Sequence, residues 1–75
     1  MKTISMVSTT LRTVGYDAQR QLLQIEFHNR SLYQYFEVPQ AVYEELMQAS
    51  SKGAYFNRSI RSHFDYVLVK ARPLS

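Results

Sequence analysis

The sequence predicts an α+β fold: a three-stranded antiparallel β-meander followed by two helices packed on one face, with a possible fourth strand near the C-terminus. Two observations carry this. Strand-like segments fill the first half of the chain, and apolar residues at helical spacing follow over 40–64. At 75 residues, we expect a single domain over 1–75. The chain has no cysteine, so the packing of six Tyr and four Phe must supply the stability that disulfides give many small domains.

The first part of the meander is predicted over residues 10–16, a β-branched segment. Leu11 and Val14 are three residues apart, so strict alternation cannot place both on one face. A bulge at Gly15 would shift the facing by one residue and resolve this conflict. The Ser/Thr-rich residues 1–9 predict at most a short edge strand.

The second strand is the clearest, because Leu23, Ile25 and Phe27 alternate with polar residues. After it comes a turn at 29–31 and an aromatic strand that contains Tyr33 and Tyr35.

The length of that turn decides which way the two tyrosines face. A three-residue loop over 29–31 places Phe27 opposite Tyr33 and Ile25 opposite Tyr35, with both tyrosines on the core face. A two-residue loop turns both tyrosines to solvent, since one residue of slip reverses every side chain. Arg30 suits the left-handed positions of a two-residue turn poorly, so we favour the longer loop and inward tyrosines.

Two helices are predicted after the aromatic strand. Pro39 is suited to the first position of the first helix, because its missing N–H costs nothing there. The apolar stripe of that helix is Val42, Tyr43, Leu46 and Met47. The second helix is predicted over 54–64, where Phe56, Ile60 and Phe64 recur every four residues.

The remaining segments have weaker signals. Residues 50–53 could form an anion-binding turn before a helix, but an inter-helix turn with Gly53 in a left-handed conformation is the commoner structure for such a segment. Residues 66–70 predict the possible last strand, and 71–75 predict a mobile tail.

The charge is uneven along the chain. The net charge is +3; residues 1–51 carry four bases against five acids, whereas residues 52–75 carry five bases against one acid. A basic end fits RNA or another polyanion, although many soluble surfaces look similar. Lys52, Arg58 and Arg61 would supply phosphate contacts along the second helix; the alternative is a solvated helix face.

The aromatic strand offers a second candidate surface. Tyr33 and Tyr35 would stack on nucleobases if their rings are exposed. The alternative is that they pack in the core with their hydroxyl groups at an edge, which is the commoner arrangement.

Several function classes find no support. No Ser-His-Asp or Cys-His order is indicated around His28 and His63, and nothing in the sequence places two carboxylates together, so we expect no catalytic site and no enzyme. Two histidines without cysteine make a poor metal site, and nothing indicates a cofactor. The chain has neither a signal peptide nor an apolar run of about 18 residues, so we expect a cytoplasmic protein with no membrane partner.

The order of motifs resembles the KTSC domain, a family named after the C-terminal end of some lysyl-tRNA synthetases that also occurs as single-domain bacterial and phage proteins. The resemblance covers roughly residues 7–64 and rests on Ser8-Thr9-Thr10, Val14-Gly15-Tyr16-Asp17, Leu23 to Phe27, Tyr33-Gln34-Tyr35, Val38-Pro39, Val42-Tyr43 and Gly53-Ala54-Tyr55-Phe56-Asn57 with Ile60. Relatives often carry glycine in the turn before Tyr-x-Tyr, where this chain has 29–31.

This resemblance implies a small non-catalytic binding module, with RNA binding suggested by the synthetase context. The nucleic-acid hypothesis therefore assigns Tyr33, Tyr35, Lys52, Arg58 and Arg61 to the binding surface. The alternative is a protein-interaction or homodimerisation module whose aromatic surface or helix pair docks a partner.

Overall fold

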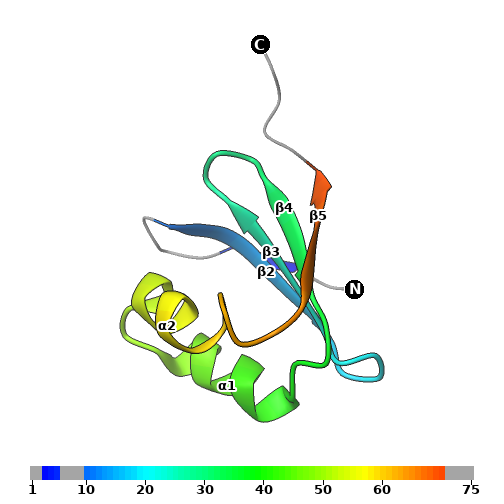
Figure 1. Cartoon of the computed structure of the whole chain (residues 1–75). Coiled ribbons are helices and arrows are strands. Elements are labelled where there is room, and N and C mark those ends of the chain that lie inside the picture. The colour runs from blue at the N-terminus through cyan, green and yellow to red at the C-terminus, as the bar shows by residue number, and fades with distance from the viewer. Residues whose placement is uncertain (1–2, 6–9, 71–75) are drawn as a thin grey trace.

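A computed structural model describes residues 3–5 and 10–70, in which a five-stranded antiparallel sheet carries two helices on one face (Figure 1). The elements are β1 (Thr3–Ser5), β2 (Leu11–Asp17), β3 (Leu22–Phe27), β4 (Leu32–Tyr35), α1 (Gln40–Gln48), α2 (Lys52–Ser59) and β5 (Tyr66–Lys70). The α+β class is confirmed, and the sheet is wider than the predicted meander because β1 and β5 extend its two edges. The lead at Ser8 and Thr9 and the predicted tail at 71–75 lie outside the described residues.

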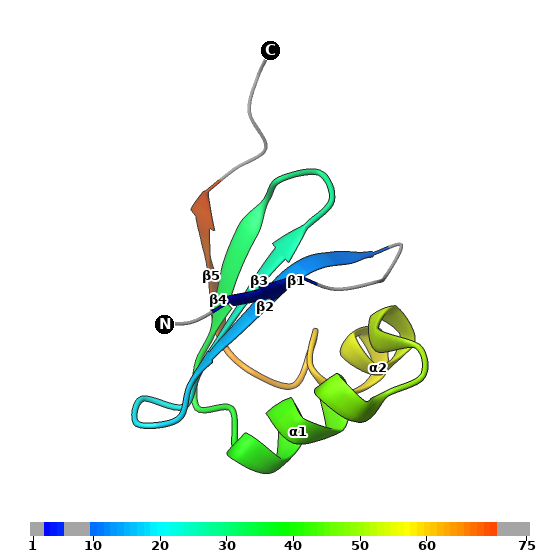
Figure 2. The ribbon, with the colours of Figure 1, turned by 180° about the vertical axis from the view of Figure 1, so that it is seen from behind.

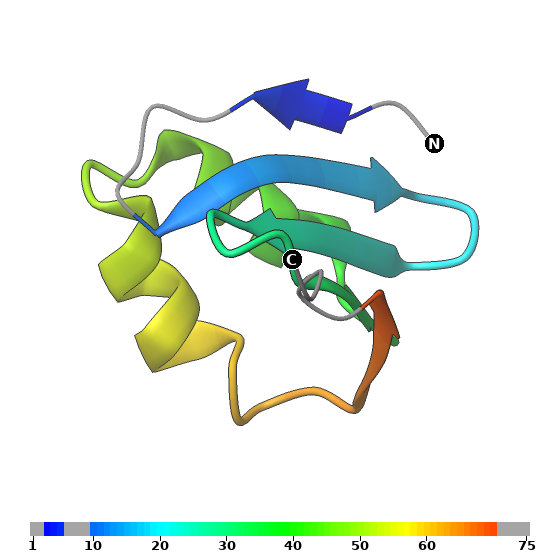
Figure 3. The ribbon, with the colours of Figure 1, turned by 90° about the horizontal axis from the view of Figure 1, so that it is seen from above.

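The strands follow one another in space in the order β1-β2-β3-β4-β5. The two helices lie between β4 and β5 in the sequence, and the chain then returns to add β5 beside β4 (Figures 1 and 2). Viewed from above, β1 and β5 stand at opposite edges of the sheet (Figure 3).

The core lies between the sheet and the helices. Leu11, Val14, Leu23, Ile25 and Leu46 are fully buried there. The other buried core residues are Tyr35, Val38, Tyr55, Phe56 and Ile60. This aromatic and aliphatic cluster supplies the hydrophobic stabilisation that a chain without cysteine needs.

The bulge expected in β2 is present, but not at Gly15. Leu11 pairs with Phe27 and Thr13 with Glu26, so Arg12 is the extra residue. Gly15 pairs regularly with Gln24. The bulge puts both Leu11 and Val14 on the buried face, and Arg12 remains on the surface, where its guanidinium lies 3.5 Å from the Glu26 carboxylate.

The register of β3 and β4 confirms that the tyrosines face inward. Ile25 pairs with Tyr33, and Leu23 pairs with Tyr35. The predicted pairs, Phe27 with Tyr33 and Ile25 with Tyr35, are wrong, because each tyrosine pairs with a β3 residue two positions earlier. The three-residue loop both begins and ends one residue earlier than predicted, which shifts the pairing by two residues. Phe27 N–H donates to the Ser31 carbonyl at 3.0 Å, so the three-residue loop is 28–30 and not 29–31.

Arg30 closes this loop in a left-handed conformation, with φ of 73°. A three-residue hairpin loop commonly ends on such a residue, which is why glycine is favoured there. The longer loop therefore also places Arg30 in a left-handed conformation. The argument that this conformation disfavours the two-residue turn applies equally to the loop that forms.

The helix bounds differ from the predicted ones. Pro39 is the N-cap of α1, with its carbonyl accepting from Val42 N–H at 3.0 Å, and not the first helical residue. Helix α2 begins at Lys52 and ends at Ser59, well before the predicted end at 64. Arg61 N–H donates to the Phe56 carbonyl, which closes a wider turn as the chain leaves the helix toward the sheet.

Gly53 lies within α2, and neither glycine has a positive φ, so the expected left-handed turn is wrong. The glycine is needed for space. A Cβ at this position would lie 2.8 Å from Thr10 Oγ1 and 3.1 Å from Thr10 Cβ, so α2 and the start of β2 approach too closely for a larger residue.

Replacing Arg30 with glycine should stabilise the protein. The change relieves a left-handed conformation that costs a non-glycine residue about 1–2 kcal/mol, and it loses about 0.4–1 kcal/mol to the added freedom of the unfolded chain. We expect a net gain of roughly 0.5–1 kcal/mol in thermal or urea unfolding. Ala18→Gly, in the exposed β2–β3 turn, is the control and should destabilise; a destabilised Arg30→Gly variant would contradict the assigned loop.

Gly53→Ala should destabilise the protein although alanine is the better helix former by about 1 kcal/mol. The new methyl group meets Thr10, and overpacking of this kind costs about 1–3 kcal/mol. We expect a lower melting temperature by circular dichroism. An unchanged or higher value would mean that α2 does not approach β2 this closely.

Candidate nucleic-acid interface

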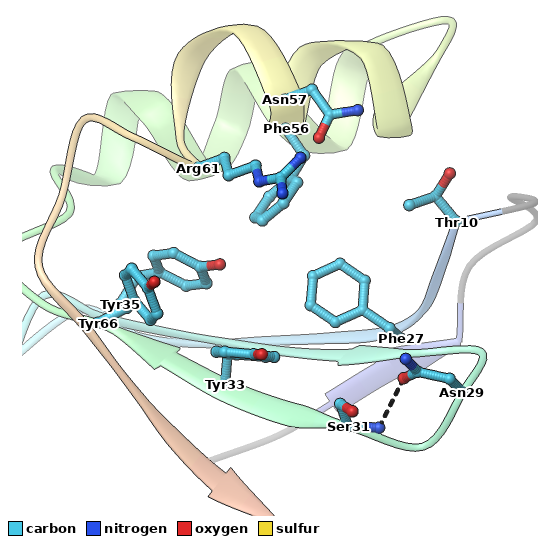
Figure 4. A pocket seen from close by; sticks show the side chains of 10 residues that line it. All are labelled: Thr10, Phe27, Asn29, Ser31, Tyr33, Tyr35, Phe56, Asn57, Arg61 and Tyr66. Atoms are coloured by element: carbon cyan, nitrogen blue, oxygen red, sulfur yellow. Dashed lines mark hydrogen bonds between the residues drawn. The ribbon is translucent and has the colours of Figure 1, made fainter. Parts of the chain in front are cut away.

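A hollow of about 390 Å³ opens between the inner face of β3 and β4 and the segment that follows α2 (Figure 4). We call it the aromatic pocket. Its lining residues are Thr10, Phe27, Asn29, Ser31, Tyr33, Tyr35, Phe56, Asn57, Arg61 and Tyr66. The pocket forms because α2 ends at Ser59 and the chain crosses to the far edge of the sheet, which leaves part of the inner face of β4 uncovered.

Aromatic rings make a continuous wall in this pocket. The ring centroid of Tyr33 lies 5.7 Å from that of Tyr66, and the Tyr35 and Tyr66 rings are 5.5 Å apart. Phe27 meets Tyr33 edge to face at 5.7 Å. Tyr35 is only 3% exposed and Tyr33 is half-buried, whereas Tyr66 is 54% exposed. Tyr33 and Tyr66 are therefore the tyrosines whose rings a ligand could cover.

Arg61 is the one charged residue in the lining of the pocket. It is exposed, follows the end of α2, and extends toward the space above the rings (Figure 4). Within the described part of the chain, no carboxylate lies within 4.0 Å of its guanidinium; the two salt bridges found there are those of Arg12 with Glu26 and of Arg20 with Asp17. The pocket therefore combines apolar rings with an uncompensated positive charge, which suits a planar group that carries an anion.

Side-chain amides stand at two sides of the opening. Asn57 projects from the exposed surface of α2. Asn29 comes from the β3–β4 loop and accepts a hydrogen bond from Ser31 N–H through Oδ1 at 2.9 Å, which leaves its NH₂ group as a donor toward a ligand. These amides can offer both donors and acceptors to the edge of a planar polar ligand.

Burial raises the pKa of Tyr35 to about 12, with smaller contributions from Tyr33 and Tyr66 that the Arg61 charge opposes. The Tyr35 phenol is consequently neutral across the physiological range. The cation of Arg61 is close enough to Tyr35 to act on its hydroxyl, which fits their common position in the pocket.

The predicted site residues fall into two groups. Tyr33, Tyr35 and Arg61 meet in the aromatic pocket. Lys52 does not join them, since its Nζ donates to the Ala49 carbonyl at 2.9 Å and holds the end of α1. Arg58 also lies elsewhere, with its guanidinium carbon 5.9 Å from the centre of the Tyr55 ring.

Arg58 belongs to a second hollow of about 340 Å³ between the two helices. Glu45 lines the same hollow and accepts a hydrogen bond from the Tyr55 hydroxyl at 2.9 Å. A carboxylate therefore shares this space with Arg58, so the hollow is less favourable to an anion than the aromatic pocket is.

Sequence reasoning missed Tyr66, Phe27 and Asn57 as pocket residues. Tyr66 belongs to the predicted last strand, but nothing local shows that this strand returns to pair with β4. Asn57 belongs to the motif that carries the family resemblance, but nothing local indicates that it lies at a pocket. The pairing of Tyr35 with Tyr66 brings β5 to the pocket, and the contacts of Phe56 with the Phe27 and Tyr35 rings bring α2 there.

Neither a metal site nor a membrane-spanning helix is found among the residues that the structure describes. No group of three or more His, Asp or Glu side chains there could hold a metal ion. None of the helices in the same residues is long and apolar enough to cross a membrane.

Comparison with known proteins places this chain in a family. Residues 7–64 match the family model of the KTSC domain. The chain belongs to the KTSC domain family. A crystal structure of a KTSC domain protein from Yersinia pestis has the same fold, with a TM-score of 0.89 and 29% sequence identity over 92% of this chain and 97% of that one.

KTSC relatives occur both alone and within larger proteins. An uncharacterized protein of Stutzerimonas stutzeri is 39% identical over 88% of this chain and 94% of its own length. A lysine–tRNA ligase of Trichormus variabilis is 47% identical over 75% of this chain, and that match spans only 10% of the ligase. A ligase of a Nostoc species is 43% identical over the same shares. The KTSC domain is thus a small part of those ligases.

Because its phenol is buried, Tyr35 should cause the free energy of unfolding to fall in strong base. Its pKa is about 12 when folded and close to 10 when unfolded, so above pH 10 the unfolded chain loses a proton that the folded chain keeps. The stability is complete below pH 10 and falls between pH 10 and 12, by roughly 2 kcal/mol for this group. Urea unfolding at successive pH values measures the decline, and Tyr35→Phe should make it shallower; an equal decline in both proteins would contradict the burial of this phenol.

Proposed function

We propose that this KTSC domain is a non-catalytic RNA-binding module that takes unpaired bases into the aromatic pocket. The observation that carries the proposal is the combination, in one hollow, of the accessible Tyr33 and Tyr66 rings with the uncompensated cation of Arg61. Bases of single strands stack on such rings, and an adjacent guanidinium binds the phosphate between them.

The dimensions of the pocket fit this use. Its volume of about 390 Å³ lies within the range typical of small-ligand sites, so it has room for a base and part of its sugar. The amides of Asn29 and Asn57 would meet the polar edge of a base whose face lies on Tyr33. A duplex would not fit, because its bases are already stacked on one another.

RNA is favoured over DNA because related domains occur within lysine–tRNA ligases. Two lysine–tRNA ligases contain a related domain as about a tenth of their length, and such enzymes are named for a tRNA substrate. The basic C-terminal third of this chain adds a long-range attraction for a polyanion of either kind.

The test is a fluorescence anisotropy titration of short single-stranded oligo(U) and oligo(A) RNA at several salt concentrations. Arg61→Gln should weaken binding and lower the slope of log K against log salt by about 0.7, the value for one phosphate contact on a single strand. Arg58→Gln removes the same charge from the other hollow and is the matched control; it should leave the slope unchanged. Equal effects of the two variants would mean a diffuse charge effect and no binding in the pocket.

A second variant tests the stacking. Tyr33→Leu keeps an apolar side chain but removes the ring, and should cost about 1–3 kcal/mol of binding free energy for each stacked base. Thermal unfolding of each variant establishes that the fold is retained. Equal affinity of the Tyr33→Leu protein, or stronger binding of DNA than of RNA with the same sequence, would contradict the proposal.

A further inference from the structure

Strand β5 is an exposed apolar edge. Each of Tyr66, Val67, Leu68 and Val69 is between 46% and 54% exposed, although they are consecutive residues of one strand. Edge strands in soluble proteins are usually short, charged, or interrupted by proline. The opposite edge, β1, follows that rule, since it has three residues and Ile4 is its one apolar side chain.

The backbone of β5 has unused hydrogen-bonding groups on its outer side. Phe36 N–H donates to the Asp65 carbonyl at 2.9 Å, which sets the phase of the antiparallel ladder between β4 and β5. Since the inward and outward groups alternate, those of Val67 face β4, and those of Tyr66 and Leu68 point away from it. In the described residues, β5 pairs only with β4, so this outward row has no strand beside it.

The side chains of β5 are apolar on both faces of the sheet. Tyr66 and Leu68 stand opposite Tyr35 and Tyr33, on the face that carries the helices, and Val67 stands opposite Gln34 on the other face. A strand that covers this edge well must therefore offer apolar side chains on both of its faces. The β5 segment itself meets this requirement.

The charges at the two ends of β5 favour an antiparallel second copy. Asp65 precedes the strand and Lys70 ends it. Parallel pairing of two copies would set each charge beside its own equivalent, whereas antiparallel pairing about Val67 places Asp65 of one copy opposite Val69 of the other, at the same end of the interface as Lys70 of that copy.

We propose that two copies of the chain pair through β5, antiparallel about a twofold axis at Val67, to form one sheet that runs through both copies. Tyr66 then lies opposite Leu68 of the second copy, and the outward N–H and C=O groups of these two residues are satisfied. The register uses the regular part of β5, because an extra residue at Val69 interrupts the pairing with β4 and limits the interface.

The dimer is a separate proposal from RNA binding, but it would determine how the two aromatic pockets are oriented relative to each other. A twofold axis perpendicular to the sheet keeps both helix layers on the same side, so the two aromatic pockets open in the same direction. The two β4 strands would be separated by the two β5 strands, which places them about 14 Å apart. One strand of RNA could thus reach both pockets.

A cysteine cross-link tests the register directly, since the natural chain has no cysteine. At the axis, the two Val67 Cα atoms would be about 4.5 Å apart, within the range that a disulfide spans. Val69→Cys is the matched control: Val69 is as exposed, at 49% against 46%, but its two copies would be about 13 Å apart. Mild oxidation of dilute protein should give a covalent dimer with Val67→Cys at least tenfold faster than with Val69→Cys; equal rates would overturn the proposal.

Sedimentation equilibrium of the unmodified chain tests the dimer without any substitution. The mass should rise with concentration toward twice 8.8 kDa. Val67→Lys places two like charges at the axis and should weaken the association at least tenfold, whereas Ile4→Lys, on the opposite edge, should not change it. A single 8.8 kDa species at millimolar concentration, or equal loss with both lysine variants, would overturn the proposal.

Discussion

The pairing of Ile25 with Tyr33 is the constraint on which the rest of the structure depends. Side chains alternate along a strand, so this register places Tyr33 and Tyr35 on the same face as the buried residues of β3. A slip of one residue would move both rings to solvent and leave Phe56 without the Tyr35 ring that it meets at 5.5 Å. The three-residue loop that ends at left-handed Arg30 holds the register, at a local cost in backbone energy.

The aromatic pocket follows from a mismatch between the two layers of the domain. Five strands make a sheet wider than two short helices can cover, and α2 ends at Ser59 before it reaches the inner face of β4 and β5. The uncovered part of that face carries Tyr33 and Tyr66, and the chain that leaves α2 carries Arg61 to its margin. Rings that would be core in a larger domain are therefore within reach of a ligand.

Strand β5 contributes to both proposed surfaces through different atoms. The Tyr66 ring helps to line the pocket, while its backbone groups lie on the open edge of the sheet. Because a ligand on the ring and a strand on the edge approach from different directions, the two kinds of contact are compatible. A domain of this size thus presents one concave surface and one linear surface on a single element.

The sequence by itself determined which way most side chains face, because alternation in β3 and the four-residue spacing in α1 are local properties of the chain. It also determined the family, from motifs spread over residues 7–64. It did not locate the bulge at Arg12, the start of the hairpin loop or the end of α2, since each depends on how a segment meets its neighbour in space. Lys52, Arg58 and Arg61 look alike in the sequence, yet the tertiary structure gives them three different surroundings: a helix end, a hollow shared with Glu45, and the aromatic pocket. The sequence shows which residues are charged, but the surroundings of each charged side chain depend on which elements pack beside it.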